Sequence, residues 1–216
     1  MNKKDKKLNL TAAQADSLME LGNIGSGNAV VALSKLLNNQ KIEMSLTGVN
    51  LIPFNELSNI LGNPNVKVFG IFSQVKGETD LSIIQIYTTE SIIEFVNTIC
   101  QTNKKLNLDK INSVEDLNDT AKDFILEVGS ILAGAYCSAL ANLMKIKLIP
   151  EVPILHLEAI SSIANNLIKK YSEITDSLVM INTKINLPES SLKGIFCFIP
   201  SIDTLDNLFR LLKKLK

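Results

Sequence analysis

A motif that occurs twice, 107 residues apart, is the feature that most constrains how this chain can fold. The first copy runs Asp16-Ser-Leu-Met-Glu20-Leu-Gly22-Asn23-Ile24, and the second runs Asp123-Phe-Ile-Leu-Glu127-Val-Gly129-Ser130-Ile131. The match continues in register through Gly27 and Gly134 to Leu33 and Leu140. A repeat of this length indicates an internal duplication. We therefore expect two similar halves about a pseudo-twofold axis, with two related sites that differ where Ser130 replaces Asn23.

Composition is that of an ordinary globular protein. The chain has 216 residues, of which 46% are hydrophobic, so it can bury a substantial core. Its 22 basic and 22 acidic residues cancel, which argues against a nucleic-acid partner and a polybasic membrane anchor. No apolar run approaches the roughly 18 residues of a membrane span, and residues 1–9 form a charged tail without an apolar signal region. We expect a cytoplasmic protein.

Cysteine and histidine usage argues against a metal centre. Cys100, Cys137 and Cys197 are widely spaced in apolar surroundings, so we expect buried free thiols. His156 is the single histidine, which cannot build a multi-histidine zinc site and is a poor basis for a catalytic triad. We expect no metal bound by this chain.

Hydrophobic periodicity and capping signals predict the same order of elements in both halves. We expect a helix over 11–37 opened by a Thr11–Gln14 capping box, extended residues 41–53, a short helix over 55–61, strands over 66–75 and 81–87, and a helix from Thr89 to Cys100. After a polar connection over 101–116, we expect a helix over 117–144, extended residues 146–157, a helix over 159–171, strands over 178–187 and 194–199, and a final helix capped by Ser201 and ended by Lys213, Lys214 and Lys216.

These elements predict an α+β fold in which one mixed β-sheet, assembled from both repeats, is flanked by helices that include two long site-bearing ones. The domain covers about residues 10–212, in repeats of about 10–101 and 116–212. Two apolar stripes are expected to be core faces, formed by Ile92, Phe95, Val96 and Ile99 and by Leu205, Leu208, Leu211 and Leu212.

Three glycines weaken the first long helix. Gly22, Gly25 and Gly27 each cost about 1 kcal/mol relative to alanine, so either a partner backbone comes close at them or the helix bends there. They loosely suggest a phosphate-binding loop. However, a nucleotide-binding loop follows a strand and precedes a helix, whereas these glycines lie well inside a predicted helix. This position argues against a nucleotide site.

Glu20 and Asn23 lie three residues apart on a helix, so an acid and an amide project from one face, one turn after Asp16. A solvated helix face explains most pairs of this kind. The adjoining glycines and the retained Glu127 of the second copy favour a site.

The run from Glu20 to Ala29, its echo from Glu127 to Gly134, and the later segment from Leu148 to Pro153 resemble the CheC, CheX and FliY family of chemotaxis phosphatases over about residues 10–212. The family signature is Asp or Ser, three residues, Glu, two residues, Asn, 22 residues and Pro. The first copy has Leu46 and Thr47 in place of the proline. The second copy, with Asp123, Glu127 and Pro153, has Ser130 in place of the asparagine.

The resemblance implies a protein that hydrolyses the aspartyl phosphate of the response regulator CheY, which brings its own Mg²⁺. It implies catalytic roles for Glu20 and Asn23, a weak second pair in Glu127 and Ser130, and signature-supporting roles for Asp16, Asp123 and Pro153. Asn23 would orient the attacking water and Glu20 would pair with a lysine of the regulator. Pro153 is expected to shape the strand beside the helix.

The resemblance also leaves room for a non-catalytic adaptor that binds phosphorylated CheY or CheD, the receptor-modifying deamidase. The intact Glu20 and Asn23 favour an enzyme, and the loss of asparagine at Ser130 favours an adaptor. A FliM-like regulator-binding peptide is absent from the N-terminal residues, which argues against a flagellar switch subunit. A structural domain with no regulator is a more distant alternative.

Overall fold

A computed structural model describes residues 10–100 and 105–212. The first half forms α1 (Ala12–Leu36), β1 (Glu43–Pro53), α2 (Phe54–Leu57), β2 (Lys67–Gly77), β3 (Leu81–Thr88) and α3 (Thr89–Ile99). The second half forms α4 (Asp119–Met144), β4 (Leu148–Pro150), β5 (Ile154–Ala159), α5 (Ile160–Tyr171), β6 (Ser177–Asn186), β7 (Ser191–Pro200) and α6 (Ile202–Leu212). Two 3₁₀ turns, Leu108–Lys110 and Val114–Asp116, lie in the connection between them.

The predicted order of elements is confirmed, with local corrections. The capping box holds, because the Gln14 N–H donates to Thr11 at 3.2 Å and the Thr11 N–H donates to Gln14 at 2.8 Å. The cap of α3 is Thr88 and not Thr89, since the Thr88 hydroxyl accepts the Ser91 N–H. The tail of residues 1–9, the side chain of Leu212 and the three terminal lysines lie outside the described residues.

Two elements differ by three residues or more at one end from their predicted extent. The short helix α2 ends at Leu57 instead of residue 61, because the chain turns away there and passes through Gly62, whose φ is +75°. The strand β7 begins at Ser191 instead of residue 194, since its first residues pair with the end of β6. The first difference arises because Ile60 and Leu61 continue the apolar spacing of a helix past its end, and the second because residues 191–193 are too few to show strand alternation.

The two repeats exchange strands in one sheet. The order is β1-β6-β7-β3-β2, and both β4 and β5 pair with β2. The hairpins β2–β3 and β6–β7 meet at the centre through β3 and β7, and the first strand of each half lies on the hairpin of the other half. The pairing direction is uniform rather than mixed, because every strand pair among the described residues is antiparallel. This order reads the same when the halves are interchanged, as a pseudo-twofold axis requires.

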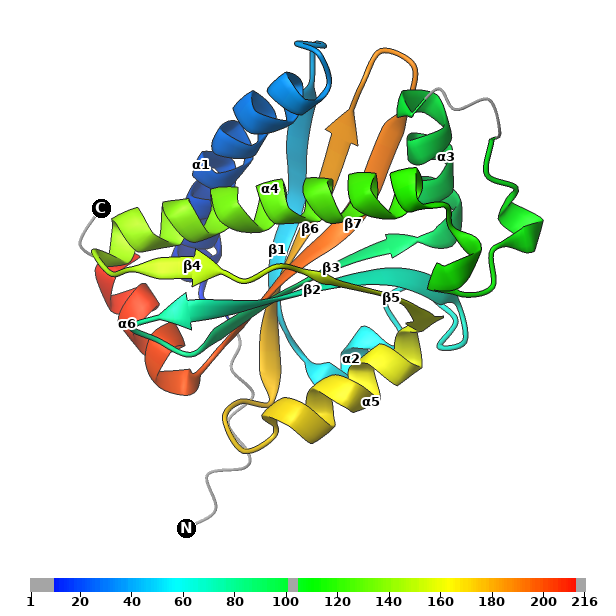
Figure 1. The fold of residues 1–216 in the computed structure, drawn as a ribbon. Coiled ribbons are helices and arrows are strands. Elements are labelled where there is room, and N and C mark those ends of the chain that lie inside the picture. Colours follow the sequence, from blue (N-terminus) through cyan, green and yellow to red (C-terminus); the bar gives the residue numbers. More distant parts are fainter. Residues whose placement is uncertain (1–9, 101–104, 213–216) are drawn as a thin grey trace.

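Helices cover both faces of the sheet (Figure 1). We call the side on which α1 and α4 lie the long-helix face, and the side on which α2 and α5 lie the α5 face. Strand alternation feeds one apolar cluster on each face: Phe69, Ile71 and Ile83 point to the long-helix face, and Val68, Ile84 and Ile86 to the α5 face. The apolar sides of α3 and α6 join the first cluster, as their stripes predicted.

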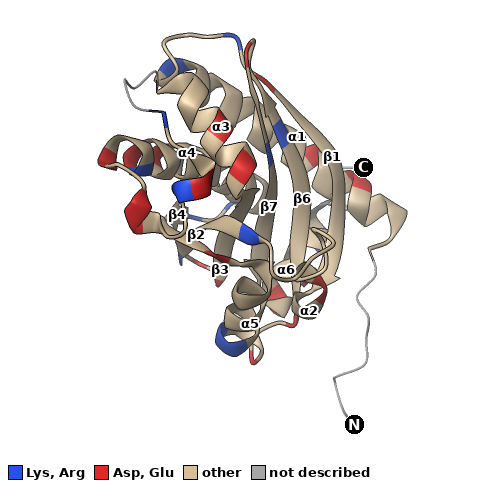
Figure 2. Cartoon of the chain, turned by 90° about the vertical axis from the view of Figure 1, so that its right-hand side faces the viewer, with Lys and Arg blue, Asp and Glu red and all other residues tan. Residues whose placement is uncertain are grey.

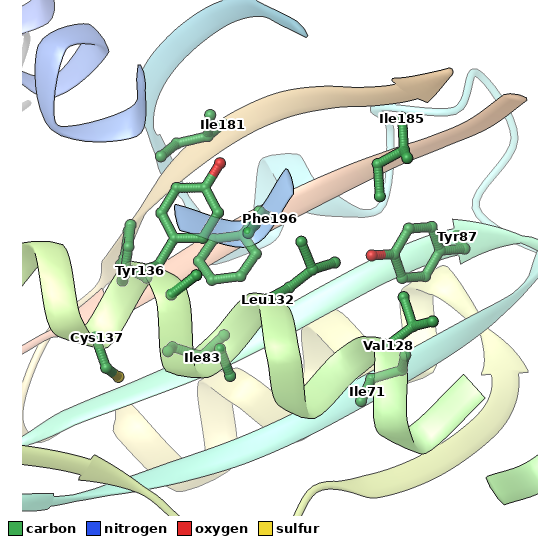
Figure 3. Close-up of a cluster of buried hydrophobic side chains, with 14 of the residues drawn as sticks. Ile71, Ile83, Tyr87, Val128, Leu132, Tyr136, Cys137, Ile181, Ile185 and Phe196 are labelled. Atoms are coloured by element: carbon green, nitrogen blue, oxygen red, sulfur yellow. The ribbon is translucent and has the colours of Figure 1, made fainter. Parts of the chain in front are cut away.

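The core under α4 is built around an aromatic contact (Figure 3). The ring of Tyr136 stacks on Phe196 of β7 with centroids 4.1 Å apart, and Leu132 lies one turn away toward Tyr87. Aromatic pairs of this kind add about 0.5–1.5 kcal/mol to the free energy of burial. Tyr136 therefore fixes where α4 sits over the central strands.

Tyr136 also joins the two long helices. Its hydroxyl lies 3.0 Å from the Ser26 hydroxyl of α1, and both groups are buried. A Cβ built on Gly25 would lie 2.6 Å from Cδ1 of the Tyr136 ring, so α1 reaches this position only because residue 25 has no side chain. The predicted close approach is thus confirmed at Gly25, but the partner is a side chain and not a backbone. By contrast, no atom of the described residues lies within 4 Å of a Cβ built on Gly27.

The helix α4 is the one described helix that is long and apolar enough, by length and composition, to cross a membrane. More than half of its most apolar 18-residue window, 56%, is buried inside the fold. Its apolar composition therefore matches its position, packed against both α1 and the sheet.

Two of the three glycines of α1, Gly25 and Gly27, offer a matched test of this packing. We expect Gly25→Ala to lower the free energy of unfolding, because displacing the Tyr136 ring costs about 1–3 kcal/mol and outweighs the roughly 1 kcal/mol that alanine contributes to a helix. Gly27→Ala gives the same gain in helix propensity without a steric clash, so it should raise the free energy of unfolding by up to about 1 kcal/mol. Urea denaturation of both variants measures the difference. Equal stabilisation by both would contradict the tight contact at Gly25.

Candidate functional site

The predicted residues of the first copy lie on the outer face of α1. Asp16, Glu20 and Asn23 are exposed, while the opposite side of the helix, including Leu18 and Leu21, is buried against the sheet. No hydrogen bond or ion pair within residues 10–100 and 105–212 engages the side chains of Glu20 and Asn23. An acid and an amide are therefore free to bind a group outside this chain.

The predicted residues of the second copy lie on α4 in the same arrangement. Asp123 and Glu127 are exposed, and Ser130 is half-buried. The helices α1 and α4 lie on the same face of the sheet (Figure 1). The structure thus brings each triplet together on its own helix, and both helices lie on the long-helix face.

The glycine inside each triplet has a packing role. Gly22 and Gly129 are buried on the inner side of their helices. A Cβ built on Gly22 would lie 2.6 Å from Cδ1 of Leu46, and one built on Gly129 would lie 2.7 Å from Cγ2 of Ile71. Both helices therefore approach the sheet closely at the turn that carries the site residues, which holds that turn against a rigid support.

A buried polar group beneath the second site was not predicted. Gln85 of β3 is fully buried, and its Nε2 donates to the carbonyl oxygen of Gly129 at 2.8 Å. The Tyr87 hydroxyl in turn donates to Oε1 of Gln85 at 3.0 Å, and burial raises the pKa of the Tyr87 hydroxyl. The signal in the sequence is one polar residue within the apolar strand from Ile83 to Tyr87. The residue opposite Gln85 on the neighbouring strand β7 is the apolar Phe196.

The signature proline lies at a break in the strand beside α4. Pro153 is buried between β4 and β5, six residues before the end of β5. In the first half, Thr47 has the corresponding position, six residues before the end of β1. Thr47 is skipped in the pairing of β1 with β6, where the register shifts between Leu46 and Gly48. Proline is tolerated in sheets at edges and bulges. The second half therefore interrupts its strand at Pro153, and the first half has a bulge at Thr47 in the corresponding position.

The thiols and the histidine lie apart from these helix faces or inside the core. Cys137 and Cys197 are buried as predicted, and burial raises the pKa of the Cys137 thiol to about 12. Cys100 is only half-buried. His156 is exposed on β5, edge-on to Phe72. In the part of the chain that the structure describes, no group of three or more His, Cys, Asp or Glu residues could hold a metal ion.

Exposed apolar residues adjoin the first site. Ile24 is 51% exposed and Val31 is 59% exposed, and they lie two helical turns apart with Gly27 between them. At the corresponding positions of α4, Ile131 is half-buried and residue 138 is a serine. Only the first site therefore combines free polar groups with an exposed apolar margin.

Fold and site together define a duplicated α+β protein whose candidate sites are open helix surfaces. Glu20, Asn23, Glu127 and Ser130 line neither of the two largest hollows found among the described residues.

Comparison with known proteins places the chain in a family. The CheC-like family model matches residues 14–45, which include the first triplet. The chain is 30% identical over 203 residues to the CheY-P phosphatase CheC of Bacillus subtilis strain 168, covering 91% of this chain and 92% of the relative. The chain belongs to the CheC-like family.

Solved structures confirm the fold. FliY of Thermotoga maritima superposes with a TM-score of 0.70 at 14% identity, covering 96% of this chain and 99% of the other. The FliM middle domain of H. pylori superposes with a TM-score of 0.64 at 9% identity, covering 94% and 99%. The likeness shows that the duplicated fold is shared with these two proteins.

The Gln85 network can be tested as a unit. We expect Gln85→Leu to lower the free energy of unfolding by about 1–3 kcal/mol, because it leaves the buried Tyr87 hydroxyl without an acceptor. The double variant Gln85→Leu with Tyr87→Phe should recover part of this loss, since both partners are then apolar. Chemical denaturation of the single and double variants gives the coupling. Strictly additive losses would show that the two side chains do not depend on each other.

Proposed function

We propose that the protein is a cytoplasmic phosphatase that hydrolyses the aspartyl phosphate of a CheY-type response regulator, with Glu20 and Asn23 as its working site. The observation that carries this proposal is the pair itself: an acid and an amide, exposed, without partners among the described residues, and placed over a glycine-packed turn. Membership of a family that includes a CheY-P phosphatase supports the choice of substrate.

Hydrolysis of an aspartyl phosphate requires few catalytic groups from the phosphatase itself. An acyl phosphate is already activated, and in this proposal the regulator contributes the Mg²⁺ that neutralises the phosphoryl oxygens. What remains is to hold a water molecule in line with phosphorus. The amide of Asn23 can accept a hydrogen bond from that water and donate another to a phosphoryl oxygen.

Docking falls to the residues around the amide. The Glu20 carboxylate, one turn before Asn23, can pair with a lysine of the regulator, and such charge-assisted bonds are the stronger ones. The exposed Ile24 and Val31 supply apolar contact area beside the open backbone at Gly27. Together they form a helix face on which a partner can settle with its phosphorylated aspartate over Asn23.

The second site is proposed to be weak. Glu127 keeps the docking acid, but the hydroxyl of Ser130 is shorter than an amide and half-buried, so it reaches less far into the space above the helix. This observation also favours the alternative function, a non-catalytic adaptor for phosphorylated CheY or CheD, at α4 more than at α1. An enzyme that catalyses at α1 and only binds a partner at α4 would account for the residues of both sites.

The first functional prediction concerns Asn23. We expect Asn23→Ala to lower the rate of regulator dephosphorylation by about 10²–10³, because it removes a group that orients the attacking water. The fold should be unaffected, since the side chain is exposed. Decay of phosphorylated CheY measures the effect, and Asn142→Ala, an exposed asparagine at the far end of α4, is the matched control. A folded Asn23→Ala protein with half the original rate would exclude the water-orienting role.

The second functional prediction concerns the serine of α4. If the halves are equivalent, Ser130→Asn should restore the missing amide, raise activity by up to about twofold, and rescue part of the activity lost in Asn23→Ala. The measurement compares the double variant Asn23→Ala with Ser130→Asn against Asn23→Ala alone. No gain in the double variant would mean that the α4 surface has diverged beyond its asparagine.

A further inference from the structure

A groove on the α5 face is not used by the proposed reaction. It lies beyond the end of α2 and holds about 660 Å³, within the size range of small-molecule sites. Its floor includes Ile86 of β3 and Ile195 of β7, and its side includes Ile60 and Leu61 from the turn after α2. Polar groups from five elements surround it: Thr47, Thr88, Ser91, Asn182, Lys184 and Lys193. We call this hollow the α2 groove.

The groove exists because the two repeats have diverged. In the second half, α5 has 12 residues and its last residue, Tyr171, lies over the sheet and donates to the Ser82 hydroxyl at 2.7 Å. The hollow beside Tyr171 is accordingly small, about 160 Å³. In the first half, α2 has only four residues, and no counterpart of Tyr171 among residues 10–100 covers the strands. The short helix therefore leaves open a stretch of sheet that its sister repeat closes.

The strand side of the groove is positively charged. Lys184 of β6 and Lys193 of β7 are direct partners in the antiparallel register, so their side chains leave the same face of the sheet side by side. Neither ammonium group has an ion-pair partner among the described residues. Like charges directly opposite each other destabilise a sheet, and an anion held between them would relieve that repulsion.

The helix side of the groove limits the charge of its occupant. Glu90 and Glu94 of α3 also line it, and Figure 2 shows acidic bands on α3, which lies beside β7. A ligand with several phosphates would bring negative charge against these carboxylates. A single phosphoryl group can instead lie at the lysines while an apolar body covers Ile86 and Ile195.

We propose that the α2 groove binds a small organic monophosphate of about mononucleotide size, with its phosphoryl group between Lys184 and Lys193 and its body on the isoleucine floor. The hydroxyls of Thr88 and Ser91 and the amide of Asn182 lie around the same hollow and can satisfy the polar atoms of such a ligand. The site is independent of the α1 surface, so it stands whether or not the protein is a phosphatase.

Isothermal titration calorimetry of the full chain with adenosine monophosphate tests the proposal. We expect saturable binding, weaker binding of adenosine because it lacks the charge, and weaker binding of adenosine triphosphate because of Glu90 and Glu94. Inorganic phosphate should also bind more weakly, since it has no body for the floor. Equal affinity for adenosine, or for inorganic phosphate, would overturn the proposed mode, as would the absence of saturable binding at millimolar concentration.

Paired variants assign the binding to the groove. Lys184→Met and Lys193→Met keep the aliphatic stem and remove the charge, so each should weaken binding by about tenfold or more. Glu90→Gln should act in the opposite direction and strengthen it. Lys169→Met, an exposed lysine on α5, is the control and should have no effect. The lysine variants should melt no lower than the original protein, because they remove a repulsion. Binding that is indifferent to both lysines would overturn the proposal.

Discussion

The antiparallel pairing of β3 with β7 is the contact on which the rest of the fold depends. It is where the two hairpins meet, and the sheet extends from it in both directions in the same order. The pseudo-twofold axis relates β3 to β7, and it also relates α1 to α4. These two long helices therefore lie on the same face of the sheet. The placement of both candidate sites on one side of the molecule follows from this pairing.

The backbone at this centre is nearly symmetric, but the side chains are not. Gln85 and Phe196 lie opposite each other under the long helices. Gln85 holds the carbonyl of Gly129, while Phe196 supports the ring of Tyr136. Both of these contacts hold α4, whereas α1 is attached to Tyr136 of α4 through Ser26 and the close approach at Gly25. Substitution of individual residues has therefore made the attachments of the two related helices different. The same divergence separates Asn23 from Ser130 and the short α2 from the long α5.

Local patterns were sufficient for most elements and for the orientation of the site. The start of α1 follows from Thr11 and Gln14 alone, and the exposure of Glu20 and Asn23 follows from their spacing on a helix whose other side is apolar. Contacts between distant residues could not be predicted in this way. The strand exchange, the bulge at Thr47 and the role of Gln85 each depend on a partner far away in the sequence. The half-burial of Ser130 likewise depends on packing rather than on helical position.

The exchange of first strands has a consequence for how this protein can change over evolutionary time. With β1 completing the sheet of the second hairpin and β5 completing that of the first, neither repeat contains all the strands that it needs. A repeat whose surface has lost its chemistry is therefore still required, because the other repeat cannot bury its sheet without it. The second half is free to vary at Ser130 but cannot be discarded. Duplication by interlocked halves thus converts a spare functional copy into a permanent structural one, whose outer surface is available for new roles.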